Sequence, residues 1–373
     1  MSFNLSTAPP GAGGAGDSPA PGAPATPTAA EFRYTQTDGF AELVRRLGAS
    51  LLVSTYEANK VLAVRAAVAG VSTLVRTFDR PMGLAVREGR VAVGTRDGVW
   101  FLRNAPDIAP RVEPAGLHDA CFLPRSCHVT GDIGVHELAW AGEELWIVGT
   151  RFSCLCTLDP DYSFVPRWRP PFVTALASED RCHLNGLAVV DGQPRYASAL
   201  GETDVKDGWR KGKASGGCLL DIPSGAVVAR GLSMPHSPRW HDGRLWVLES
   251  GTGRLVLVDA RTGKWQAVAE VPGFGRGLCF AGRLAFVGLS KIRKTSAMDG
   301  VPLVERRDQL KCSVAVMDLA AGRVVGLLDF QTAVEEVFDV QLLLGVRFPE
   351  VVGFQKDSLQ HTFVVPPEGR PGH

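Results

Sequence analysis

The chain has 373 residues and carries 40 Lys and Arg against 39 Asp and Glu, which gives a formal net charge of +1. This balance offers no electrostatic basis for binding nucleic acid or an anionic membrane surface. No apolar run reaches the roughly 18 residues that a membrane-spanning helix needs. We therefore expect a cytoplasmic protein that acts on a small molecule or a peptide, or that binds a partner protein.

Residues 1–30 differ in composition from the rest of the chain. They are rich in Pro, Ala, Gly and Ser, contain no Lys or Arg, and lack a continuous apolar segment. This composition predicts a disordered tail and argues against a signal peptide. We expect residues 31–373 to form one domain that begins with a short amphipathic helix over residues 40–47, ended by Gly48. The eight cysteines include no Cys-x-x-Cys pair, so we expect reduced thiols.

A short apolar segment recurs along the chain, followed each time by a tight-turn pair and a second apolar run. One copy is Gly-Leu-Ala-Val at residues 186–189, followed by Asp-Gly at residues 191–192. The copies align on Leu84, Leu138, Leu187, Pro238 and Leu278. A second recurrent piece, Asp-x-x-x-Gly after an apolar strand, suits a turn in which Asp accepts backbone hydrogen bonds and Gly adopts a positive φ. Each repeat thus holds about four antiparallel strands in roughly 40 to 60 residues, the pattern of a β-propeller blade.

These repeats predict an all-β chain folded as a β-propeller of six four-stranded blades, with seven possible. A sixth copy of the innermost strand is expected near residues 338–341. The strands at residues 51–54 and 61–65 have no innermost strand of their own. We expect the segment from Val337 to supply it, so that N- and C-terminal strands close the ring and leave no unpaired edge. A β-sandwich is the structural alternative, and the internal repeat argues against it.

The repeat places polar side chains at one position around the propeller axis. Two residues before the aligned Leu or Pro, the copies have Met82, His136, Asn185, His236, Arg276, and either Glu336 or Phe338. His183 precedes Asn185 by two residues and so faces the same way, because strand side chains alternate. Polar groups that converge on an axis require a ligand, water or a metal to satisfy them.

Two imidazoles with an amide and a carboxylate predict a site for one divalent metal. Imidazole suits iron, copper and zinc, and iron or copper is favoured if a third or fourth histidine joins. The expected ligands are His136, His183, His236, Asn185 and His128, and the candidate catalytic residues are Arg276, Glu336 and Glu137. Arg276 could hold a carboxylate or phosphate bidentately, or could simply pair with Glu336.

Three functions remain open on these residues. The first is a metal-dependent oxidoreductase or oxygenase that acts on a small or peptide-borne substrate. The second is a metal-dependent hydrolase or lactonase, in which the metal activates water. The third is a non-catalytic propeller that docks a partner protein, with structural histidines in its channel. Long connections over residues 202–217 and between residues 289 and 312 are expected to be either lids or solvated loops.

Several segments resemble the motifs of a bacterial family of conserved hypothetical proteins. The clearest are Cys-His-Leu-Asn-Gly-Leu-Ala at residues 182–188 and Met-Pro-His-Ser-Pro-Arg-Trp at residues 234–240, and the resemblance covers about residues 31 to 365. That family is a domain of unknown function, so the resemblance implies no established reaction.

A more distant resemblance links residues 185–188, Asn-Gly-Leu-Ala, to the six-bladed propellers of the gluconolactonase and regucalcin type. In those enzymes a channel Asn, with Glu and Asp, binds a divalent metal for lactone hydrolysis. The resemblance extends to Asn185, with Glu336 as the candidate carboxylate. His236 stands where that pattern has Asp, which argues against calcium-type lactonase chemistry. The four-His iron centre of carotenoid-cleaving oxygenases offers an analogy of architecture only.

Overall fold

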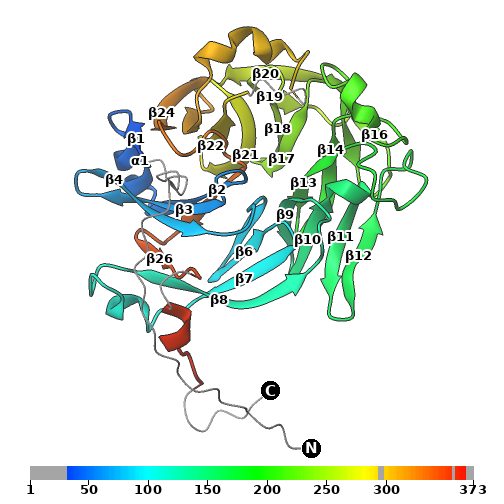
Figure 1. The fold of residues 1–373 in the computed structure, drawn as a ribbon. Helices are drawn as coiled ribbons and strands as arrows, with labels where there is room; N and C mark the ends of the chain where they lie inside the picture. The colour runs from blue at the N-terminus through cyan, green and yellow to red at the C-terminus, as the bar shows by residue number, and fades with distance from the viewer. Residues whose placement is uncertain (1–31, 293–297, 355–357, 367–373) are drawn as a thin grey trace, which may run out of the picture. The chain divides into compact units, whose positions relative to one another are not determined.

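Residues 34–351 of the chain form six β-sheets arranged in a ring (Figure 1). The computed structural model describes residues 32–292, 298–354 and 358–366. The predicted disordered tail, residues 1–30, lies outside the described residues. The six sheets confirm the predicted six-bladed β-propeller, with the innermost strand of each blade facing the axis.

Four blades contain four antiparallel strands each. The third blade comprises β9 (Val135–Ala141), β10 (Glu144–Gly149), β11 (Cys154–Asp159) and β12 (Tyr162–Trp168). The fourth comprises β13 (Leu184–Val190), β14 (Gln193–Ala199), β15 (Gly217–Asp221) and β16 (Val227–Leu232). The fifth comprises β17 (Pro235–His241), β18 (Arg244–Glu249), β19 (Arg254–Val258) and β20 (Trp265–Glu270).

The first blade closes the ring by joining the two ends of the domain. It comprises β25 (Asp339–Leu344), β2 (Ala49–Thr55), β3 (Lys60–Ala67) and β4 (Gly70–Thr77). The late strand β25 is innermost and pairs antiparallel with the early strand β2, with Leu51 opposite Leu342. This pairing confirms the closure predicted from the sequence, and it leaves no free edge at the axis.

Two blades have a fifth strand at the outer edge, which the four-stranded prediction did not include. The second blade comprises β5 (Leu84–Arg87), β6 (Arg90–Gly94), β7 (Gly98–Asn104), β8 (Ala120–Val129) and β26 (Pro349–Val351). The sixth comprises β21 (Phe274–Ala281), β22 (Leu284–Ser290), β23 (Ser313–Asp318), β24 (Arg323–Phe330) and β1 (Tyr34–Gln36). Strand β26 runs parallel to β8, and β1 runs antiparallel to β24. These additions cover edges that would otherwise be exposed.

Tight turns and buried apolar faces explain why the repeats fold as blades. Asp191 and Gly192 both have positive φ, 49° and 73°, as a two-residue hairpin turn requires. Between the fifth and sixth blades, the fully buried Leu248 and Leu278 belong to one apolar cluster. Burial of each such side chain contributes about 1.5–3 kcal/mol.

The innermost strands approach one another closely at the axis. Gly277 has a φ of 73°, and a Cβ atom there would lie 2.4 Å from the backbone nitrogen of Val340 on β25. Any larger residue would therefore separate β21 from β25. The glycine before the aligned leucine thus allows the close packing of neighbouring blades.

The helix α1 (Phe40–Arg46) confirms the predicted helix over residues 40–47, with its C-terminal end one residue earlier. Its buried Phe40 and Val44 pack against Phe330 and Val316 of the sixth blade. The remaining helical segments are 3-10 turns at Ala109–Arg111, Thr150–Phe152, Gly208–Lys211, Pro302–Gln309 and Ser358–His361. No described helix combines the length and apolar character needed to cross a membrane. All eight cysteines are free thiols.

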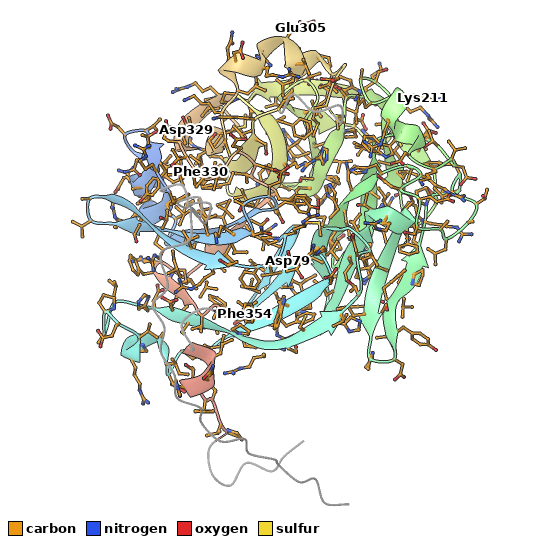
Figure 2. All side chains as sticks on the ribbon, in the orientation of Figure 1. Asp79, Lys211, Glu305, Asp329, Phe330 and Phe354 are labelled. Carbon is orange, nitrogen blue, oxygen red and sulfur yellow. The ribbon has the colours of Figure 1, made fainter. Side chains whose placement is uncertain are left out.

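The two long connections are not simply solvated loops. The 3-10 turns Gly208–Lys211 and Pro302–Gln309 contribute Trp209 and Leu303 to a buried cluster with Phe274 at the start of β21. Figure 2 shows Lys211 and Glu305, one from each of these turns, toward the outside of the ring. The connections therefore anchor to the blade ends through apolar side chains and expose charged ones.

Candidate functional site

Three histidines from successive blades meet near the axis. His136 lies on β9, His183 directly precedes β13, and His236 lies on β17. The ring centroid of His136 is 5.6 Å from that of His183 and 5.5 Å from that of His236. The structure thus brings together the three histidines that the repeat register predicted.

A cavity of about 340 Å³ opens at this end of the axis. The repeat positions that line it are Met82, His136, Arg276, Glu336 and Phe338, together with His183. Both alternatives considered for the last blade, Glu336 and Phe338, therefore reach the same cavity. His236 does not line it; this residue is buried, and its ring stacks 5.5 Å from the ring of His136, measured between centroids.

His183 is oriented by a carboxylate. Its Nδ1 atom lies 2.8 Å from Oδ2 of Asp180, and the indole Nε1 of Trp209 donates to the same oxygen at 3.0 Å. Because the carboxylate accepts, Nδ1 of His183 carries the proton. Nε2 then holds the lone pair in the neutral ring and has no partner among the described residues. The Trp209 ring, 4.4 Å from the imidazole centroid, fixes the ring further.

His236 has an unpartnered nitrogen in the protein interior. Its Nδ1 atom lies 2.9 Å from the carbonyl oxygen of Met234, which can only accept, so Nδ1 carries the proton. Nε2 is buried and has no hydrogen-bond partner within the described residues. Burial first, and then the charge of Arg276, lowers the pKa of His236 well below its usual value. The ring is therefore neutral, and Nε2 presents a bare lone pair.

His136 is also neutral. Burial is the main cause that lowers its pKa well below the usual value, with smaller contributions from His236, His183 and Arg276. A hydrogen bond to the backbone of Asn185 opposes this shift. The cluster consequently offers uncharged imidazoles near neutral pH, the form that accepts a proton or binds a metal.

Arg276 and Glu336 form an ion pair in the cavity wall. Nη1 of Arg276 donates to Oε1 of Glu336 at 2.8 Å, and each side chain is 14% exposed. The guanidinium lies over the rings of Phe274 and Phe338, 5.4 Å and 5.0 Å from their centroids. Nε of Arg276 and Oε2 of Glu336 are buried without partners. The pair predicted from sequence therefore exists, and it leaves donors on Arg276 unused.

Asn185 and His128 do not join this site, which corrects the predicted ligand set. The amide nitrogen of Asn185 donates to the carbonyl oxygen of Pro235 at 2.9 Å, and its oxygen accepts from Ser198 at 2.6 Å. Both polar ends of this buried amide are thus engaged, one within its own blade and one with the next blade. His128 lies on the outer strand β8, where its Nε2 contacts the carbonyl oxygen of Tyr162 at 3.0 Å. The repeat predicts which side chains face the axis only for the innermost strand of each blade, and β8 is an outer strand.

Glu137 belongs to a different polar layer. Its carboxylate pairs with Arg239, and the nearby Asp339 accepts from the backbone nitrogens of Leu84 and Val340 at 2.8 Å and 2.7 Å. Burial, which Arg239 opposes, raises the pKa of Glu137 to about 7, and burial also raises the pKa of Asp339. Glu137 does not line the cavity with the histidines. Its position therefore gives no support to the predicted catalytic role.

Sequence reasoning missed Asp180, Trp209 and Arg239. Asp180 precedes His183 by three residues, so its spacing could have indicated a carboxylate partner. Trp209 lies in a long connection between strands, outside the repeat, so the repeat pattern could not predict its position beside His183. Arg239 directly follows the aligned Pro238, but its partner Glu137 comes from a blade two positions away.

The described residues contain no group of three or more His, Cys, Asp or Glu side chains placed to hold a metal ion. The donor chemistry nevertheless suits a transition metal, because His183 and His236 each have Nδ1 held by an acceptor and Nε2 unpartnered. The rings of His183 and His236 flank that of His136 at 5.6 Å and 5.5 Å, measured between ring centroids. A metal site here would need reorientation of at least one imidazole.

Comparisons with solved structures show the fold. The chain is similar to a chain of the Nidogen/Laminin complex, with TM-score 0.52, 13% identity and coverage of 80% of this chain and 99% of that one. It is also similar to a protein of unknown function from Bacteroides caccae, with TM-score 0.50, 9% identity and coverage of 79% and 98%. At these identities the likeness extends to the propeller architecture and no further.

Sequence comparisons give the family. No curated protein sequence matches the chain. A family model does match residues 38–352, which confirms the resemblance noted from the histidine-bearing motifs. The chain belongs to the family described as Domain of unknown function (DUF4915).

Proposed function

We propose that the axial cavity is the active site of a hydrolase, in which His183 is the general base that activates water. The observation that carries this proposal is the 2.8 Å contact between Nδ1 of His183 and Asp180. A carboxylate in this position fixes the tautomer of the imidazole and stabilises the imidazolium that forms when Nε2 accepts a proton. The free thiols suit a cytoplasmic enzyme.

Water is the favoured nucleophile because the serine and threonine hydroxyl groups of the cavity wall, those of Ser290 and Thr150, donate to backbone carbonyl oxygens. Ser290 donates to the carbonyl oxygen of Val337 and accepts from its backbone nitrogen, both at 3.0 Å. Thr150 donates to the carbonyl oxygen of Leu184 at 2.6 Å. Neither hydroxyl donates to a histidine, so neither has the activated geometry of a serine-type nucleophile.

The proposed reaction is hydrolysis of a small ester or lactone. As the water oxygen bonds to the acyl carbon, Nε2 of His183 takes its proton. When the bond between the acyl carbon and the leaving oxygen breaks, the imidazolium returns this proton to the leaving oxygen. General base catalysis of this kind contributes about 10²–10⁴-fold to the rate. A cavity of about 340 Å³ has room for a substrate of this size.

Hydrolysis of two substrates tests the proposal. The ester p-nitrophenyl acetate releases a chromophore, and the lactone dihydrocoumarin releases acid. We expect His183→Gln to lower kcat/KM by about 100-fold or more, and Asp180→Asn to lower it by a similar factor. His241→Ala is the matched control, because this histidine contacts the carbonyl oxygen of Gly282 at a hairpin turn. Hydrolysis that survives His183→Gln would contradict the proposal, as would no turnover of either substrate above the uncatalysed rate.

A metal-dependent enzyme is a second candidate, favoured by the unpartnered Nε2 of His236. His136, His183 and His236 would be the ligands of an iron, copper or zinc ion, and iron or copper would supply redox chemistry. Elemental analysis of untagged protein tests it. Stoichiometric metal that is lost in His136→Ala and His236→Ala, but retained in His241→Ala, would support this candidate. Metal-free protein that hydrolyses p-nitrophenyl acetate or dihydrocoumarin would exclude it. A protein with neither metal nor turnover would favour the non-catalytic, partner-binding propeller.

A further inference from the structure

We infer that Arg276 is the binding residue for a carboxylate group, and that the ligand of the axial cavity is a small monocarboxylic acid or carboxylate-bearing compound with an apolar body. This inference names the ligand class of the cavity to which the proposed function assigns hydrolysis, and it rests on that function only in taking this cavity as the ligand site.

The guanidinium of Arg276 has one edge unused. Glu336 accepts from Nη1 alone, at 2.8 Å. The Nε atom is buried and has no hydrogen-bond partner among the described residues, and the hydrogen bond of this guanidinium within the described structure is the one from Nη1 to Glu336. The N–H groups of Nε and Nη2 lie side by side, and this edge matches the two oxygens of a carboxylate. The ion pair with Glu336 therefore leaves unpaired the edge whose shape suits a second, bidentate partner. Because Nε is buried, a carboxylate reaches this edge only when the side chains that cover it move.

Aromatic side chains hold this edge in place. Phe274 and Phe338 lie 5.4 Å and 5.0 Å from the guanidinium carbon, measured to their ring centroids. Phe274 is fully buried and belongs to the apolar cluster that anchors both long connections. A guanidinium fixed in this way loses little conformational entropy when a ligand binds.

The rest of the cavity wall suits the carbon body of such a ligand. Met82, Met298 and the two phenylalanines supply apolar surface, and Lys291 and Glu57 also line the wall. Lys291 and Glu57 carry opposite charges, so Arg276 is the group on which binding of an anionic ligand depends. The carboxylate of Glu336 beside Arg276 disfavours a doubly charged phosphate more than it disfavours a monoanion. The geometry therefore points to a carboxylate in preference to a phosphate.

Titration calorimetry on the full chain tests this inference with acetate, phenylacetate and phenylpyruvate, and with phenylacetamide as the uncharged match of phenylacetate. We expect at least one acid to bind and phenylacetamide to bind about tenfold more weakly than phenylacetate, or not at all. Arg276→Gln should weaken binding of the acid by about tenfold or more, and Arg276→Lys, which keeps the charge but not the two-pronged edge, should weaken it by a smaller factor. Arg261→Gln is the control, because Arg261 is 92% exposed.

Glu336→Gln gives the sharpest result, because it removes the negative charge that competes for Arg276. We expect this variant to bind the acid at least about threefold more tightly than the natural chain. The double variant Arg276→Gln/Glu336→Gln keeps the net charge of this pair at zero and leaves no unpaired charge, so it separates loss of binding from misfolding. No binding by any of the three acids, or equal binding by the natural chain and Arg276→Gln, would overturn the inference.

The test separates this inference from the proposed hydrolase. His183→Gln should abolish ester hydrolysis while phenylacetate affinity changes less than about threefold, because Arg276 supplies the binding contact. Acid binding that depends on Arg276 in a chain without hydrolase activity would sustain the inference and reject the hydrolase. If hydrolysis depends on His183 but acid binding is the same in the natural chain and in Arg276→Gln, the hydrolase is supported and the inference is rejected.

Discussion

Two polar layers lie on the innermost strands of the same propeller, and they differ in how far their atoms are satisfied. In the layer of Glu137, Arg239 and Asp339, charged groups pair with one another and with backbone nitrogens. In the histidine layer, Nε2 of His236 and Nε of Arg276 have no partner in the described structure. Buried polar atoms without partners cost free energy, so these two atoms of the histidine layer are candidates for satisfaction by a ligand. The comparison favours a structural role for the first layer, and it is consistent with the binding role that we propose for the second.

The largest loss of stability should follow from disrupting the layer of Glu137, Arg239 and Asp339. Arg239→Leu leaves the buried Glu137 and Asp339 without their cation, and we expect it to lower the free energy of unfolding by about 3–5 kcal/mol. Denaturant unfolding measures this loss. Arg46→Leu is the control, because Arg46 is 76% exposed and pairs with Glu42 on the helix surface, where such pairs contribute about 0.3–0.5 kcal/mol. Similar losses in the two variants would show that the Glu137 layer is not structural.

A second prediction uses the opposite pKa shifts of the two layers. The pKa of Glu137 is raised by burial from 4.5 to about 7, so the folded state binds its proton more tightly. The stability that this proton contributes is fully present below about pH 4.5 and is lost as the pH rises to about 7. The pKa values of His136 and His236 are lowered from 6.5 by burial. Their contribution is present above about pH 6.5 and is lost as the pH falls below it.

Unfolding free energies measured between pH 5 and 8 separate these contributions. Glu137→Gln should remove a decline of about 2–3 kcal/mol between pH 5 and 7. His236→Gln should instead reduce the loss of stability on the acid side of pH 6.5. A Glu137→Gln variant with the same pH profile as the natural chain would mean that Glu137 does not titrate in this range.

The smallest effect should come from the histidine at the periphery. His128 is partly exposed on β8 and contacts the carbonyl oxygens of Tyr162 and Ser163. We expect His128→Ala to lower the free energy of unfolding by about 0.5–1 kcal/mol, the net contribution of one hydrogen bond. Ester hydrolysis and phenylacetate affinity should not change. A loss of either function in this variant would show that the outer face of the second and third blades takes part in the site.

Much of the fold follows from local pattern. The hairpin turns at residues 191–192 and 242–243 have the positive φ values that Asp-Gly predicts. The recurring strands predicted six blades, the closure by the segment from Val337, and the shared position of His136 and His236. The outer strands β1 and β26 escaped prediction because each has only three residues and pairs with a segment far away in the chain.

Sequence alone determined which residues lie on the innermost strands and thus reach the axis, because strand periodicity and turn chemistry are local properties. Only the tertiary structure decided what each of these residues does there. Asn185 and His236 occupy equivalent positions, yet Asn185 finds Ser198 and Pro235 as partners whereas Nε2 of His236 finds none. Hydrogen-bond satisfaction depends on groups that other blades and long connections bring within about 3 Å, and a repeat pattern carries no information about those groups.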